Sequence, residues 1–429
     1  ASIIARSLAY VDFDKASKQD VEMLKRLVVE FSDELSALGV RVDELDARVA
    51  VLEKDLGGWS LAGVMEFNAK FVDDDTVRDV SGKADFDIDK YRIFLRKRID
   101  EKTSFTARLG SSGGHENGAA GMEWEQYYIT TTLPYDIEFT FGRAPIDWEG
   151  DLGLYADDDA WWGDFNRQMF KFKKDWGMAN LELVFARAYD NGEDIVSYTD
   201  PDGDEYSVTA EYFLLAGLLN FDFSEKVSAG ILAYYLIADD DPVVDINSVI
   251  IPEPGGGDVL TFGAYAKFQF HPSVELKGLY YYQDIDLRDA DNTNAWKIIL
   301  DVNQDLLKFT SLWLEYAQFE EGFWVNNQPY AVNDGLLGYI APGGMFLEDT
   351  TVFGVRAAQQ WSDKWSTWER YWVADPDDWS DAETNNFTFA VGYQYSPAIY
   401  FELAYDVLDS DGYGYDSDSL IRFQTVVNF

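Results

Sequence analysis

The residues best suited to bind a ligand in this sequence are acidic residues held close together in a turn. Asp200, Asp202 and Asp204 follow the order D-x-D-G-D, with Gly203 where a calcium-binding loop needs a sharp bend. Hard divalent cations prefer such carboxylate oxygens, so the segment is a candidate structural Ca2+ site. The glutamate that would complete an EF-hand is missing, and a solvated acidic turn is the alternative. We expect no other cofactor.

Side chains suited to catalysis are sparse. The chain has no cysteine, which excludes a thiolate nucleophile, a cysteine metal site and a disulfide framework. Its two histidines are His115, in a glycine-rich stretch, and His271, in a His-Pro turn, and neither has a serine nearby in a nucleophile-elbow setting. We therefore expect no enzymatic activity.

A second group of candidate residues is basic. In three segments arginine and lysine alternate with apolar residues, and a period of two places such side chains on one face of a strand. Lining a pore, they would set its electric field, whereas pairing with neighbouring carboxylates would make them structural. The members of this basic cluster are Arg92, Arg96, Arg98, Arg108, Arg167, Lys171 and Lys173.

Overall charge excludes some partners. The 429 residues include 78 Asp and Glu against 34 Lys and Arg, a formal net charge of −44 that would repel nucleic acid. Acidity often accompanies disorder, but an aromatic content of 16% favours a folded chain. No apolar run approaches the ~18 residues of a spanning helix. This composition is typical of a secreted β protein or a transmembrane β-barrel.

The elements that must position these residues are β-strands. From Trp59 onward, apolar and polar residues alternate in repeated segments of about 9–13 residues, the length that a tilted strand needs to cross a bilayer. The predicted strands are 59–71, 88–100, 102–110, 123–133, 135–143, 165–174, 178–189, 206–223, 226–238, 259–270, 273–285, 295–303, 307–318, 349–361, 364–373, 384–395, 398–407 and 419–429.

The connections between these strands alternate between tight turns and long polar loops. This arrangement predicts an all-β transmembrane fold, an antiparallel up-and-down barrel of about 18 strands with 16 as the alternative. Both chain ends of such a barrel lie on the side of the short turns. Aromatic residues near the strand ends suit interfacial girdles, with sugar-stacking platforms as the alternative.

One long loop, 144–164, is a candidate constriction. Folded into the barrel, its carboxylates would face the basic cluster across a narrow wet passage and orient dipolar solutes. An outward, solvated loop is the alternative. Its acidic residues are Asp147, Glu149, Asp151, Asp157, Asp158 and Asp159.

The segment before the barrel has a different period. Apolar residues there are spaced alternately by three and four, which predicts a left-handed coiled coil and hence self-association, whereas a single amphipathic helix is the alternative. Gly57 and Gly58 end the pattern. The predicted seam is Val21, Leu24, Val28, Phe31, Leu35, Leu38, Val42, Leu45, Val49 and Leu52.

Both ends of the chain resemble known bacterial proteins. The last strand alternates and finishes on Phe429, which resembles the signal read by the barrel-assembly machinery of outer membranes. The first residues, ASIIARSLAYVD, resemble the end of an S-layer-homology (SLH) domain. Together with the heptads and the barrel, the chain resembles the SLH-bearing outer-membrane porins of diderm bacteria.

That resemblance implies a division into a remnant of an SLH-type domain at 1–14, a periplasmic coiled-coil stalk at 15–58 and an outer-membrane barrel at 59–429. It implies a homotrimer in outer-membrane lipid, coupled to peptidoglycan or a secondary cell-wall polymer. The expected function is passive diffusion of small hydrophilic solutes and ions. Residues 59–429 carry −40 of the net charge, which favours cations. The alternatives are a structural tether or a substrate-specific channel, for example one for a sugar.

Overall fold

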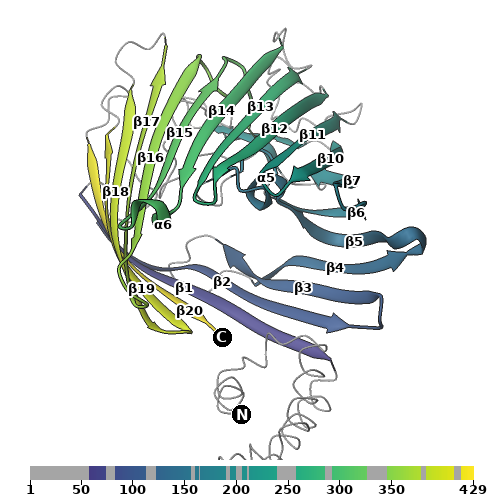
Figure 1. Ribbon diagram of the computed structural model, residues 1–429, viewed down its shortest axis with the longest axis horizontal. Helices are drawn as coiled ribbons and strands as arrows, with labels where there is room; N and C mark the ends of the chain where they lie inside the picture. The colour runs from purple at the N-terminus through teal and green to yellow at the C-terminus, as the bar shows by residue number, and fades with distance from the viewer. Residues whose placement is uncertain are drawn as a thin grey trace, which may run out of the picture.

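Long strands pair edge to edge around a common interior in the computed structural model (Figure 1). The structure describes residues 58–73, 83–112, 122–155, 160–163, 165–189, 194–199, 205–209, 212–238, 258–285, 292–325, 345–377, 383–409 and 417–429. The SLH-like remnant, the heptad seam, Asp157 to Asp159 and the Asp200 to Asp204 turn lie outside these residues.

Eighteen strands form one antiparallel sheet that closes where β1 pairs with both β2 and β20. The count agrees with the expectation of about 18 rather than 16. In chain order the barrel strands are β1 (Trp59–Val72), β2 (Ala84–Arg98), β3 (Thr103–Ser112), β4 (Glu123–Leu133), β5 (Ile137–Ile146), β6 (Phe165–Asp175), β7 (Ala179–Tyr189), β10 (Tyr212–Ser224), β11 (Val227–Ala238), β12 (Val259–His271), β13 (Val274–Ile285), β14 (Thr293–Val302), β15 (Ser311–Phe319), β16 (Thr350–Gln360), β17 (Trp365–Pro376), β18 (Thr384–Ser396), β19 (Ile399–Asp409) and β20 (Asp418–Asn428).

One predicted strand is divided in the structure. The segment 206–223 separates into β9 (Glu205–Thr209) and β10, and β9 pairs with β8 (Asp194–Thr199) in a separate two-stranded sheet. The β8–β9 hairpin extends the connection between β7 and β10. Sequence alternation continues through this region, so it could not show where the barrel strand begins. The Asp200 to Asp204 turn connects β8 and β9.

Alternation along each strand separates two faces. On β12, Leu260, Phe262 and Phe268 are exposed, whereas Thr261 and Tyr265 between them are buried. The exposed side chains form an apolar outer wall, and the buried ones face the interior. Among the described residues, no helix is long and apolar enough to span a membrane.

The short turns gather at one end of the barrel together with both termini of the described sheet. Exposed aromatic side chains mark this end on the outer wall, among them Trp59, Trp176, Trp361 and Trp365. The barrel also closes here. Gly63 and Phe429 exchange two backbone hydrogen bonds, of 2.6 and 3.0 Å, and the Phe429 ring covers Gly63 so closely that a Cβ there would lie 2.3 Å from Cζ.

Candidate functional site

The chain that follows β5 turns into the barrel. A short helix, α5 (Trp148–Asp151), lies inside the ring of strands (Figure 1). After it, Gly153 adopts a φ of +67°, which glycine tolerates best, and reverses the chain direction. The Leu154 amide then donates to the Glu149 carbonyl at 3.1 Å. We call residues 146–155 and 160–163 the inner loop.

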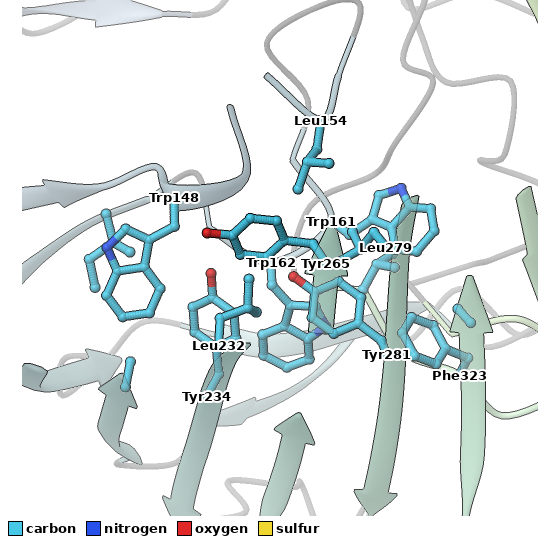
Figure 2. Packing of buried hydrophobic residues seen from close by; sticks show 14 of the residues in the cluster. Trp148, Leu154, Trp161, Trp162, Leu232, Tyr234, Tyr265, Leu279, Tyr281 and Phe323 are labelled. Atoms are coloured by element: carbon cyan, nitrogen blue, oxygen red, sulfur yellow. The ribbon is translucent and has the colours of Figure 1, made fainter. Parts of the chain in front are cut away.

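Aromatic side chains anchor the inner loop to the barrel wall. Trp148, Trp161 and Trp162 are at most 3% exposed. The Trp162 ring stacks 5.6 Å from Tyr234 of β11, and Trp161 lies 4.6 Å from Phe319 of β15, centroid to centroid. Figure 2 shows the three tryptophan rings of the loop gathered with Tyr234 and Tyr281 from the strands in one cluster. The loop therefore packs against the wall that runs from β11 to β15.

A carboxylate sits inside this aromatic cluster. Glu149 is fully buried and accepts hydrogen bonds from the Tyr281 hydroxyl of β13 and from the backbone amides of Trp162, at 3.1 Å, and Gly163, at 2.9 Å. Loss of water around the carboxylate raises its pKa, and these hydrogen bonds oppose the rise in pKa only in part. Glu149 thus connects both ends of the inner loop to the wall.

Three lysines from consecutive strands complete the attachment. Lys267 of β12 donates to the Leu152 carbonyl at 3.0 Å, and Lys277 of β13 donates to the Gly153 carbonyl at 2.9 Å. The ammonium group of Lys297 of β14 lies 3.3 Å from the Tyr155 ring centroid, a cation–π contact. These lysines lie outside the basic cluster predicted from the sequence. The sequence pattern that could have identified them is one inward-facing lysine in each of three neighbouring strands.

The base of a second long connection also enters the interior. Gln283 of β13 exchanges two hydrogen bonds with the backbone of Trp324, of 2.6 and 2.8 Å, and the Trp324 ring meets Trp162 edge-on at 5.1 Å. Phe346, beyond the same connection, stacks 4.1 Å from Phe319. Two connections therefore fill the interior along β11 to β16. No feature of the sequence predicts this second inward segment.

The basic cluster divides into groups with different partners. Arg92 and Arg108 share the Glu125 carboxylate, at 3.4 and 2.5 Å, as in the salt-bridge alternative. Arg96 is exposed on the inward face of β2. Arg98 instead donates to the carbonyls of Asp100 and Glu101 in the adjacent short turn. Its guanidinium therefore stabilises the turn at the barrel rim, unlike the pore-lining role expected.

The remaining members of the basic cluster lie near the base of the inner loop. Lys171 donates to the Pro145 carbonyl at 3.3 Å, and Arg167 donates to the Asn166 carbonyl at 3.1 Å. Lys173 pairs with Glu182 of β7 at 2.8 Å, and Glu182 also accepts a hydrogen bond from the Trp148 indole at 3.1 Å. The direct contacts of these residues run through two carbonyls and Glu182, while the charges of Lys171 and Lys173 also interact with the Asp151 carboxylate of the inner loop.

The loop carboxylates are also arranged differently from one another. Asp147 occupies the N-cap position of α5, Glu149 turns into the aromatic cluster, and Asp151 is exposed. The three are therefore not one acidic row. Among the described residues, no group of three or more histidine or carboxylate side chains is arranged to hold a metal ion. His271 accepts a hydrogen bond from the Ser273 amide within a short turn.

A second set of arginines lies on the wall between β16 and β20. Arg422 pairs with Glu402 at 2.9 Å, and Glu402 also accepts the indole N–H of Trp368 at 2.9 Å. Arg356 and Arg370 both lie 5.6 Å from the Trp368 ring. The inner loop does not cover this part of the wall. Together with Arg92, Arg96 and Arg108, these arginines make the uncovered wall rich in guanidinium groups. A polar solute passing the inner loop would meet this wall.

Comparison with known proteins supports the fold. No family model matches the chain, and no curated protein matches it. Crystal structures of OccK3 (OpdO) from Pseudomonas aeruginosa and OccAB4 from Acinetobacter baumannii are similar, with TM-scores of 0.55 and 0.52. Their sequence identities are 10% and 12%, covering 88% and 86% of this chain and 97% of each of those chains. An anion-selective porin from Comamonas acidovorans has a TM-score of 0.49 at 13% identity, covering 86% of this chain and 99% of that one. At these identities the likeness shows a shared barrel fold.

Proposed function

We propose that this protein is a bacterial outer-membrane porin that lets small hydrophilic solutes and ions diffuse through a narrowed barrel. The observation that carries the proposal is the inner loop, bonded through Glu149 and three lysines to one wall while a guanidinium-rich wall remains opposite. A loop held across part of a barrel narrows the passage without sealing it, and charged groups lining the passage favour polar solutes.

The outer wall supports a membrane location. Its exposed side chains are apolar along most of the length of the strands, and aromatic residues lie around the short-turn end. Barrels embedded in lipid have the same two features. The side with short turns would face the periplasm, and the long connections would face the cell exterior. Incorporation into planar bilayers tests the proposal, because a porin gives stepwise, ohmic increases in current.

Ion preference is a finer part of the same proposal. Residues 59–429 carry a net charge of −40, and a strongly acidic entrance raises the local concentration of cations. The arginines of the passage act in the opposite direction at the constriction. We propose a modest cation preference, set by the entrance. A reversal potential that indicates anion preference across a KCl gradient would refute it.

Coupling to the cell wall is a second candidate function, favoured by the SLH-like sequence at 1–14. We propose that residues 15–58 form a coiled-coil stalk that holds three copies together and leads toward peptidoglycan or a secondary polymer. Co-sedimentation of the full-length native protein with purified sacculi tests this role. A protein that stays in the supernatant would leave the pore as the sole function.

Phe429 and the acidic turn have proposed roles of their own. The Phe429 ring lies on the outer wall at the strand that closes the barrel, consistent with a signal for the barrel-assembly machinery. Calcium at Asp200, Asp202 and Asp204 would rigidify the β8–β9 hairpin. Calcium-dependent protection of that hairpin from protease would support the site.

A further inference from the structure

The outer wall carries a row of polar side chains near the long connections of β4 to β7. Cross-strand pairing places them side by side, and we call them the outer arginine row: Tyr127 of β4, Arg143 of β5, Gln168 of β6 and Arg187 of β7. Their sequence neighbours Ala144, Met169 and Ala186 belong to the buried interior cluster, so the row itself faces outward. A hydrogen bond of 3.4 Å from Gln168 to the Tyr127 hydroxyl lies along the row.

The outer arginine row lies at a similar depth on each of its strands. Tyr127 is four residues from the end of β4 that meets a long connection, and Arg143 is three residues from that end of β5. Gln168 and Arg187 are three and two residues from the corresponding ends of β6 and β7. At roughly 3.3 Å per residue and a tilt near 40°, the row lies about 5–10 Å inside these ends. This depth matches the boundary between headgroups and acyl chains in the outer leaflet.

An apolar aromatic surface adjoins the row on the side of the short turns. The next outward residues of β5 to β7 are Phe141, Phe170 and Phe185, which pair across the strands. Phe139 stacks 5.4 Å from Phe141 and 4.8 Å from Phe172. Phe170 is 50% exposed and Phe185 is 47% exposed. We call these five residues the phenylalanine terrace, and its stacked rings offer acyl chains a broad apolar surface.

The charge of the row calls for an anion from outside the barrel. Arg143 donates through Nε to the Glu125 carbonyl at 3.1 Å, and its terminal nitrogens have no partner among the described residues. Arginine is the scarce charge in a chain of net charge −44, yet two arginines lie in one outward row. Guanidinium groups bind phosphate through parallel hydrogen bonds, and their long side chains can reach from the apolar band to the interface.

We propose that the outer arginine row binds the phosphate of an outer-leaflet lipid whose acyl chains lie on the phenylalanine terrace. The inference rests on the membrane location in the proposed function. Neighbouring strands are about 4.8 Å apart, so a phosphate above Gln168 lies within reach of Arg143 on one side and Arg187 on the other. The wall thus recognises the headgroup charge and the chains of one lipid together, outside the passage that solutes take.

Lipid retention, measured by native mass spectrometry, tests the site on the wild-type protein. The full-length native protein in a neutral detergent is mixed with lipid A, which carries phosphates, or with the same lipid after its phosphates have been removed. Lipid A should be retained several-fold more than the dephosphorylated lipid. Added NaCl should lower the retention of lipid A, because salt screens the guanidinium charges. Equal retention of the two lipids would overturn the proposal.

A matched pair of double variants locates the binding. Arg143→Gln/Arg187→Gln removes two cations from the row and should lower the retention of lipid A several-fold. Lys97→Gln/Lys174→Gln removes two cations from the outer wall at the short-turn end and should retain lipid A as the wild type does. Heat-modifiable gel mobility shows whether each barrel has folded. Equal retention by the two folded variants would refute a site at the arginine row.

Two further measurements separate the ways in which the account can fail. An arginine variant that forms smaller assemblies in gel filtration but retains its lipid would make the row a contact between copies, and the lipid proposal would be wrong. The same variant should still give current steps in planar bilayers, because the row lies outside the lumen. A wild-type protein that retains lipid A but conducts no current would refute the porin proposal and support the lipid site.

Discussion

The Tyr281 hydroxyl of β13 donates a hydrogen bond to the Glu149 carboxylate, joining two residues 132 positions apart in the chain. Glu149 also accepts from the amides of Trp162 and Gly163, so one side chain fixes the start and the end of the inner loop. The loop then stands away from the guanidinium-rich wall. The width of the passage therefore depends on this connection together with the lysine and aromatic contacts that hold the same loop.

Barrel closure should depend on the absence of a side chain at Gly63. A Gly63→Val substitution places atoms where the Phe429 ring now lies, and overpacking of this kind costs about 1–3 kcal/mol. The folded fraction, measured by heat-modifiable gel mobility, should fall. Gly278→Val is the matched control, because a Cβ at Gly278 has an ordinary 3.6 Å contact as its nearest. Equal loss in both variants would contradict this role of Gly63.

The buried pair of Lys297 and Glu315 should show strong coupling. Their charged atoms lie 3.7 Å apart, and the side chains are 0% and 2% exposed. Lys297→Met leaves Glu315 without this cation and should destabilise the barrel by about 3–5 kcal/mol. Adding Glu315→Gln should restore much of that loss. Thermal unfolding of the four proteins measures the coupling, and additive effects would show that the pair is not coupled.

Much of the barrel follows from local sequence, because a period of two fixes which face each residue occupies. The predicted strand 123–133 coincides with β4, and most other boundaries agree within a few residues. The strand 206–223 was wrong at its start, since the β8–β9 hairpin has the same alternation as a barrel strand. Alternation cannot distinguish a strand that pairs in the barrel from one that pairs with its neighbour in a loop.

Acidification should strengthen the attachment of the inner loop. Burial raises the pKa of Glu149 above its ordinary value of 4.5, so the docked loop binds a proton more readily than a released one. The stabilisation from that proton is present at pH values below the raised pKa and is lost as the pH increases through it. Single-channel current noise from loop motion should therefore decrease as the pH falls from neutral.

The Glu149→Gln variant isolates this effect from the titration of other carboxylates. It has no proton to gain at residue 149, so the component of the pH response due to loop motion should disappear. Asp151→Asn is the control, because it removes a second carboxylate of the same helix, whose pKa is also raised by partial burial but which does not bind the Tyr281 hydroxyl or the loop amides. The idea fails if the Asp151 variant loses the response and the Glu149 variant retains it.

Arg96 should influence ion selectivity more than Arg98 does. Arg96 is exposed on the inward face, whereas Arg98 is engaged with the carbonyls of a short turn. Arg96→Gln should shift the reversal potential toward cations, by an amount that decreases as salt screens the charge. Arg98→Gln should shift it less. Equal shifts would place both guanidinium groups in the conduction path.

The candidate site could be predicted only in outline from the sequence. The sequence predicts an acidic loop but not whether it points into the barrel, because inward packing depends on Tyr234, Tyr281 and Phe319 from strands far along the chain. For Arg92 and Arg108 the sequence allows either a pore-lining role or salt bridges to neighbouring carboxylates. The carboxylate that they share, Glu125, lies at a register shift between β3 and β4. Such tertiary contacts leave no local periodic signal.

Single-channel conductance in planar bilayers tests the central claim most directly, with the wild-type protein and Glu149→Ala recorded side by side. The wild type should give discrete ohmic steps. The alanine variant leaves the Tyr281 hydroxyl and two amides without their acceptor, so its loop should detach and its steps should be larger and noisier. A wild-type barrel that inserts without any current steps, or identical steps from both proteins, would contradict a pore narrowed by this loop.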